Sequence, residues 1–119
     1  MKPESRDNAY LWDMLQAADE ARGLCRGFTF ETIAGDRRTL LALERLMELI
    51  GEAARRVSEG FQRAHPEIEW RKIIGLRNVL AHEYGQIDHR RLFLTATDDT
   101  AALSRILTAI IPDQGKQER

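Results

Sequence analysis

A cation, a titratable ring and a phenol lie close together in the second half of the chain. Arg77, His82 and Tyr84 fall within the stretch RNVLAHEYGQID at residues 77–88, with Asn78 directly after the arginine. An arginine presents a planar fork of N–H donors that matches phosphate oxygens. A histidine exchanges a proton near neutral pH, because its ordinary pKa is about 6.5. The set therefore suits a substrate that carries a phosphate.

The spacing alone does not bring these side chains to one point. At about 100° per residue, Arg77 and His82 lie roughly 140° apart around a helix axis, whereas Asn78 and His82 share a face. Convergence requires the helix to end near His82, or Arg77 to reach round with its long side chain. The alternative interpretation is structural, because cations are favoured at a helix C-terminus and a tyrosine can close a helix end.

Apolar residues recur at helical spacing through most of the chain, and no segment alternates as a strand does. The expected fold is an all-α antiparallel bundle of four main helices plus one short helical turn. Ser5 or Asp7 is placed to cap the first helix and Asp88 the last, and Pro66 separates the second from the third. The main helices are expected at about 7–25, 36–63, 69–82 and 88–111, with the short turn at 28–35.

The longest expected helix, 36–63, carries an apolar stripe wide enough to pack against more than one neighbour. Small residues at Gly51, Ala53 and Ala54 would let another helix approach closely. The stripe comprises Leu40, Leu43, Met47, Ile50, Ala54, Val57 and Phe61, widened by Leu41, Leu46, Leu49 and Ala53.

Length and composition are those of one soluble domain. The chain has 119 residues, 43% hydrophobic and 31% charged, enough for one core and too few for two ordinary domains. We expect a single domain over 1–119, with its core at about 6–111 and a polar tail at 112–119. No apolar run approaches the roughly 20 residues that span a bilayer, and the N-terminus lacks the apolar region of a signal peptide. A cytoplasmic protein that binds no membrane is therefore expected.

Charge and cysteine content limit the partners and cofactors. The formal charge of −1 argues against a strongly basic nucleic-acid binder, although a local basic patch remains open. A single cysteine, Cys25, permits no internal disulfide and no thiolate metal cluster. A basic rim for RNA could extend over six side chains, although arginines are also ordinary on exposed helix faces: Arg55, Arg56, Arg71, Lys72, Arg90 and Arg91.

The remaining polar residues give weaker signals. His65 is interpreted as a solvated turn residue, and His89 has no partner at metal-ligand spacing. Of the glutamate ladder on the long helix, Glu52 alone would approach the 77–88 stretch across the bundle. The ladder is interpreted as a solvated or salt-bridged stripe rather than a di-metal site, and consists of Glu44, Glu48 and Glu52.

The stretch from Arg77 to Asp88 resembles the signature of the HepT-like toxins of the HEPN superfamily. Its context is similar too: LIGEAA at 49–54 and PEIEWRKIIGL at 66–76 stand in the family's order and spacing. The resemblance extends from about residue 6 to residue 111.

The resemblance implies an HEPN-like, homodimeric, metal-independent endoribonuclease without a cofactor. It would act as the toxin of a two-gene module whose antitoxin is a minimal nucleotidyltransferase. On the family pattern Arg77 and His82 are the catalytic pair, Tyr84 is the residue that the antitoxin adenylylates, and Asn78 is a supporting polar residue.

The chemistry of RNA is consistent with this implication. The 2′-hydroxyl of RNA is its own nucleophile, so neither a side-chain nucleophile nor a metal-bound water is required. One chain offers one histidine in the motif, and a two-fold dimer would supply both a base and an acid. The RNA target, with tRNA among the candidates, and any higher assembly with the antitoxin are open. The alternative is a non-catalytic subunit that binds a nucleotide or the partner transferase.

Overall fold

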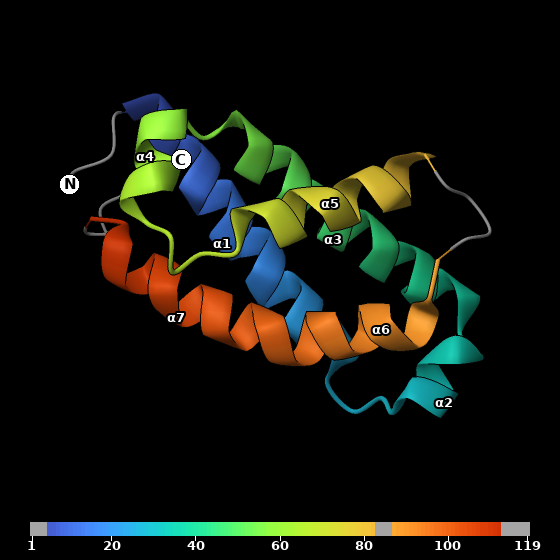
Figure 1. The fold of residues 1–119 in the computed structure, drawn as a ribbon. Helices are drawn as coiled ribbons and strands as arrows, with labels where there is room; N and C mark the ends of the chain where they lie inside the picture. The colour runs from blue at the N-terminus through green and yellow to red at the C-terminus, as the bar shows by residue number, and fades with distance from the viewer. Residues whose placement is uncertain (1–4, 83–86, 113–119) are drawn as a thin grey trace.

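The computed structural model describes residues 5–82 and 87–112 (Figure 1). Within these ranges the chain is helical and contains no strand, which confirms the all-α class. Tyr84, the glycine expected to stop the third helix and the polar tail after residue 112 lie outside the described residues. The elements are α1 (Ser5–Cys25), α2 (Phe30–Ala34), α3 (Arg37–Arg56), α4 (Glu59–Ala64), α5 (Trp70–His82), α6 (His89–Leu94), the π-helical turn η1 (Thr95–Asp99) and α7 (Thr100–Ile110).

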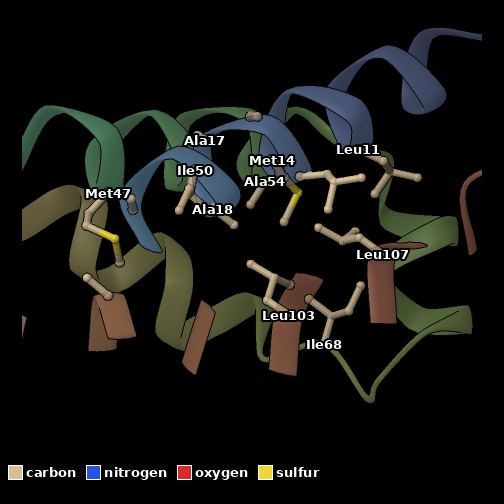
Figure 2. Packing of buried hydrophobic residues seen from close by; sticks show 14 of the residues in the cluster. Leu11, Met14, Ala17, Ala18, Met47, Ile50, Ala54, Ile68, Leu103 and Leu107 are labelled. Atoms are coloured by element: carbon tan, nitrogen blue, oxygen red, sulfur yellow. The ribbon is translucent and has the colours of Figure 1, made fainter. Parts of the chain in front are cut away.

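The longer helices lie side by side around a common apolar core. α1 packs against α3 and α7, and α3 packs against α5 on its other side (Figure 1). Core side chains of α1, α3 and α7 meet between these helices, and each buried leucine contributes roughly 1.5–3 kcal/mol. Figure 2 shows among them Leu11, Met14, Ala18, Ile50, Ala54 and Leu107, all at most 2% exposed.

The long helix expected over 36–63 is two helices in the structure, α3 and α4. Asp36 caps α3, where its carboxylate accepts from the Thr39 backbone N–H at 3.2 Å. The helix then ends at Val57, whose backbone is extended at φ −69° and ψ 139°. Ser58 starts α4, because its hydroxyl accepts from the Phe61 backbone N–H at 3.3 Å. A serine that bonds the backbone in this way favours a helix start over a helix interior.

The sequence offered two residues, Ser5 and Asp7, as the cap of the first helix. Asp7 does not cap α1, so that alternative is wrong. It lies inside the first turn of α1, only 5% exposed, and its carboxylate accepts from both the backbone N–H and the hydroxyl of Ser58, at 2.9 and 2.6 Å. This contact ties the start of α1 to the junction between α3 and α4. A buried carboxylate needs such partners, because burial without hydrogen bonds costs free energy.

The last expected helix contains a π-helical turn. Asp88 caps α6 as expected, with its carboxylate accepting from the Arg91 backbone N–H at 3.1 Å. Thr97 of η1 donates its hydroxyl proton to the Phe93 carbonyl at 3.0 Å, and Thr100, the first residue of α7, donates to the Ala96 carbonyl of η1. Threonine hydroxyls that bond the preceding turn compete with the regular helical ladder. The helix therefore widens here and resumes as α7.

The apolar stripe of α3 is narrower than expected. Leu41 and Leu49 are 47% and 38% exposed, so these two do not widen the buried face, whereas Ala53 is buried. The short turn expected at 28–35 is confirmed as α2, capped by Thr29. Among the described residues, no helix combines the length and apolar character needed to cross a membrane.

Candidate functional site

Arg77 lies where α5 approaches α3 most closely. The two helices run in opposite directions (Figure 1), and a Cβ atom built on Gly51 of α3 would lie 2.2 Å from the Cβ atom of Arg77 and 2.9 Å from the Ile73 carbonyl oxygen. No side chain fits at such distances, so glycine is what allows the contact. The close approach that the sequence indicated for Gly51 is therefore confirmed, and its partner is the helix that carries Arg77.

The Arg77 guanidinium is held by two oxygen atoms. Its Nη2 donates to Glu52 Oε2 at 3.2 Å and its Nη1 to Asn78 Oδ1 at 3.0 Å. The side chain is 17% exposed, and its Nε is buried. Counting the described residues alone, one of the five N–H donors of the guanidinium remains on each terminal nitrogen for a ligand. That pair suits two oxygens of a phosphate group.

Glu52 is shared between two arginines. Its Oε1 accepts from Arg55 Nε at 2.8 Å, while its Oε2 faces Arg77. The hydrogen bond from Arg55, followed by the charges of Arg55, Arg77 and Arg56, lowers the pKa of Glu52 below its ordinary value. The carboxylate is therefore ionised at neutral pH. Two guanidinium groups and one carboxylate leave this cluster with a charge of +1, which complements the single negative charge of a phosphodiester.

His82 is the last residue of α5 and is exposed. Whether His82 converges with Arg77 depends on the chain after His82, which lies outside the described residues. In the ranges that the structure describes, no hydrogen bond or ion pair joins His82 to Arg77, and about 7–8 Å of helix axis separates the two residues. The structure thus brings Arg77 and Asn78 together with Glu52, and His82 does not join this group within the described residues.

A second glutamate of α3 holds a histidine at the same end of the molecule. Glu44 Oε2 lies 2.8 Å from Nε2 of His89, in the first turn of α6. The sequence analysis found no partner for His89, because 45 residues separate it from Glu44. Glu48, one turn along, pairs with Arg45 at 3.5 Å. All three glutamates of the ladder are thus in ion pairs or hydrogen bonds, which confirms the interpretation of the ladder as a salt-bridged stripe.

His65 is not a solvated turn residue, contrary to expectation. Its side chain is 16% exposed, its Nδ1 lies 2.8 Å from Glu67 Oε2, and its ring centroid lies 4.5 Å from that of Phe61. Its carbonyl accepts from the indole N–H of Trp70 at 2.9 Å. His65 therefore joins α4 to the start of α5 and has a structural role.

Between described residues, three of the six side chains of the candidate basic rim are paired with acids. Besides Arg55, Lys72 lies 3.1 Å from Asp99. Arg90 lies 3.8 Å from Glu31. Within the described part of the chain, no three His, Cys, Asp or Glu side chains group as metal ligands.

A cavity of about 600 Å³ lies on the other side of α5, between it and the segment α6–η1–α7. Its lining is mainly apolar and its rim is charged. The apolar part includes Met47, Leu76, Val79, Leu92, Leu103 and Ile106, and the rim includes Lys72, Asp88, Arg91 and Asp99.

Comparison with known proteins identifies the family. The family model described as "Ribonuclease HepT-like" matches residues 14–110. The chain belongs to the HepT-like ribonuclease family. Among its relatives, "Probable ribonuclease HepT" of Thermococcus cleftensis is 36% identical over 103 residues, which cover 87% of this chain and 92% of that protein.

More distant relatives carry names of the same kind. A protein of Methanocaldococcus jannaschii whose name marks it as an RNase is 28% identical over 97 residues, 82% of this chain and 89% of its own length. Another, from Caldanaerobacter subterraneus, is 28% identical over 102 residues, 86% of this chain and 91% of its own. No solved structure matches the chain significantly. The HepT-like family confirms the enzyme class expected from the sequence, an endoribonuclease.

Proposed function

We propose that this HepT-like protein is a metal-independent endoribonuclease and the toxin of a toxin–antitoxin module with a minimal nucleotidyltransferase. Arg77 and His82 form its catalytic pair, and Asn78 supports Arg77. The observation that carries the proposal is the held guanidinium of Arg77. With respect to the described residues it keeps two N–H groups for a ligand, on a helix whose last described residue is an exposed histidine.

The cleavage step needs only the RNA and these side chains. The 2′-hydroxyl attacks the adjacent phosphorus, the P–O5′ bond breaks, and a 2′,3′-cyclic phosphate and a 5′-hydroxyl result. His82 takes the proton of the 2′-hydroxyl or gives a proton to the leaving 5′-oxygen. The terminal N–H groups of Arg77 stabilise the charge that grows on the non-bridging oxygens. No cofactor takes part in this scheme.

The proposal takes residues 1–119 as one HEPN-like domain, a bundle of four main helices, that works as a homodimer. In-line cleavage benefits from a base and an acid together, and each chain has one histidine in the motif. A two-fold axis near the ends of the two α5 helices would bring both copies of His82 to one RNA strand. A monomer with full activity, found by light scattering at assay concentration, would contradict this part.

Tyr84 is the proposed site of silencing, and this part rests on the sequence resemblance. Adenylylation by the nucleotidyltransferase would add a phosphate and a base two residues from His82. The new negative charge can pair with Arg77, and the adenosine would fill the space that the RNA needs. The toxin is then inactive while it remains folded.

The test is cleavage of intact tRNA and a defined single-stranded RNA by the purified protein in EDTA. Mass spectrometry first establishes that Tyr84 carries no adenylate. We expect cleavage that leaves 2′,3′-cyclic phosphate ends, loss of cleavage in His82→Ala, and cleavage unchanged in His89→Gln, which replaces a histidine outside the site. If the unmodified protein cleaves neither RNA but binds a nucleotide or the transferase, the non-catalytic binding subunit replaces the toxin proposal.

A further inference from the structure

Glu52 and Gly51 touch the two ends of one side chain. Gly51 lies against the Cβ and Cγ atoms of Arg77, and a Cβ atom on this glycine would come within 2.2 and 3.0 Å of them. Glu52, the next residue of α3, accepts from the guanidinium at 3.2 Å. The aliphatic part of Arg77 and its guanidinium are therefore both held by two consecutive residues of α3, and Glu52 lies 25 residues from Arg77 in sequence.

From this arrangement we propose that Glu52, with Gly51 beside it, is a positioning residue for Arg77. Its role is to fix the guanidinium so that the two remaining terminal N–H groups point at the phosphoryl oxygens. This inference rests on the proposed ribonuclease function and adds a residue to its machinery. Glu52 acts through Arg77 and does not itself touch the RNA.

The second arginine on Glu52 explains how a carboxylate is compatible with an RNA site. An unpaired carboxylate beside Arg77 would repel the substrate phosphate. Arg55 occupies Oε1 and Arg77 occupies Oε2, so the two arginines do not compete for one oxygen atom. The side chain of Arg55 is 47% exposed, against 17% for Arg77. Arg55 thus neutralises the carboxylate from the solvent side, while Arg77 is oriented from the helix interface.

The expected effect of losing Glu52 follows from geometry. Without it the guanidinium keeps only the Asn78 oxygen as a partner, and a long side chain with one anchor samples more rotamers. A displaced catalytic group costs rate in the chemical step, by as much as about 100-fold for a shift on the order of 1 Å. We therefore expect kcat to fall about 10-fold or more in Glu52→Ala and less in Glu52→Gln, which keeps an oxygen acceptor. KM should change less than kcat.

The test measures single-turnover cleavage by Glu52→Gln, Glu52→Ala and the control Glu48→Gln. Glu48 lies one turn earlier on α3 and pairs with Arg45 of its own helix, so its variant should cleave at the wild-type rate. A double-mutant cycle separates positioning from a general loss of structure. In the Arg77→Ala background, Glu52→Gln should change the rate less than about twofold. The same loss with and without Arg77 would overturn the proposal.

A spectroscopic measurement covers the case in which Arg77→Ala is too slow to assay. In ¹H–¹⁵N spectra of arginine side chains, hindered rotation of the Arg77 guanidinium is expected in the wild type and in Glu48→Gln, and averaged signals in Glu52→Ala. An Arg77 guanidinium that is equally hindered in Glu52→Ala would also overturn the proposal. This measurement needs no cleavage. Failure of the ribonuclease function and failure of Glu52 as a positioning residue are thus visible separately.

Discussion

The two sides of α5 are built in opposite ways. On the side of α3 the backbones approach so closely that a single methyl group at Gly51 would clash with Arg77 and with the Ile73 carbonyl. On the side of α6–η1–α7 a cavity of about 600 Å³ separates the helices. Both sides belong to one helix of 13 residues. The packing partner, rather than the sequence of α5 alone, therefore decides how tightly each of its faces is held.

This difference shows which part of the molecule determines the position of Arg77. Close-packed interfaces have little room to relax, so they transmit displacement directly. Gly51 and Glu52 of α3 determine where the guanidinium of Arg77 lies. The open side makes no comparable demand, since its charged rim includes an exposed ion pair, that of Lys72 with Asp99. We expect matched glycine substitutions on the two sides to change stability with opposite sign, and the loss of an ion pair to cost less on the open side.

The largest effect is expected for Gly51→Ala, on the close side. The new Cβ atom meets the Arg77 Cβ atom and a backbone carbonyl, neither of which is the free end of a flexible side chain. Overpacking of this kind costs about 1–3 kcal/mol, offset in part by the roughly 1 kcal/mol by which alanine favours a helix. Urea unfolding should show a net loss of stability, and cleavage should fall with it. A variant as stable as the wild type would mean that α5 moves freely against α3.

The next effect concerns the carboxylate on the same side. Glu52→Gln should lower the free energy of unfolding at pH 7 by about 1 kcal/mol, since the lost bonds are charge-assisted but partly exposed. The pKa of Glu52 is lowered from 4.5 by the hydrogen bond from Arg55 and the charges of the nearby arginines. An acid with a lowered pKa stabilises the fold above its ordinary pKa and loses this contribution as the pH falls through the lowered value. Urea unfolding should therefore show the difference between wild type and variant constant from pH 8 to pH 6 and absent in strong acid. A difference that persists in strong acid would refute the assignment to the ionised pair.

The matched substitution on the open side should act in the opposite direction. Gly75 lines the cavity, and a Cβ atom built on it meets nothing within 4 Å. Gly75→Ala then gains helix propensity without a clash, and should raise the free energy of unfolding by about 0.5–1 kcal/mol. Urea unfolding of Gly75→Ala and Gly51→Ala under the same conditions measures the difference between their stability changes directly. Equal losses in the two variants would show that the faces of α5 do not differ.

Much of the fold is predictable because helical periodicity is local. The bounds of α1, α2 and α5 and the cap at Asp88 follow from residues within a few positions of each other. The break between α3 and α4 does not follow from neighbouring residues. Ser58, which starts α4, is bonded to Asp7, 51 residues away. The π-helical turn was also missed, since Thr97 and Thr100 change the hydrogen bonding without changing the apolar pattern.

The same contrast between local and long-range contacts decides which parts of the site can be predicted. Arg77, Asn78 and His82 stand in one local motif, and α5 carries all three, as the sequence predicts. Glu52 was considered as a residue that reaches the motif, but only the packing of α3 on α5 shows which atom it contacts. The bond from Glu44 to His89 had no sequence signal. Periodicity identifies the face on which a residue lies and leaves the rotation of one helix against another undetermined.

The smallest effect is expected at the rim of the open side, where Lys72 pairs with Asp99. The two side chains are 50% and 44% exposed, so Asp99→Asn should cost at most about 0.5 kcal/mol, and less in high salt. The hydrogen bond and charge of Asp99 raise the pKa of Lys72. A base with a raised pKa stabilises the fold below its ordinary value, and the contribution is lost as the pH rises through the raised one. Urea unfolding of both proteins should therefore show a small difference that is constant from pH 6 to pH 9 and absent in strong alkali. A cost above about 1.5 kcal/mol would mean that this ion pair holds α5 against η1 and that the open side is as constrained as the side that carries Arg77.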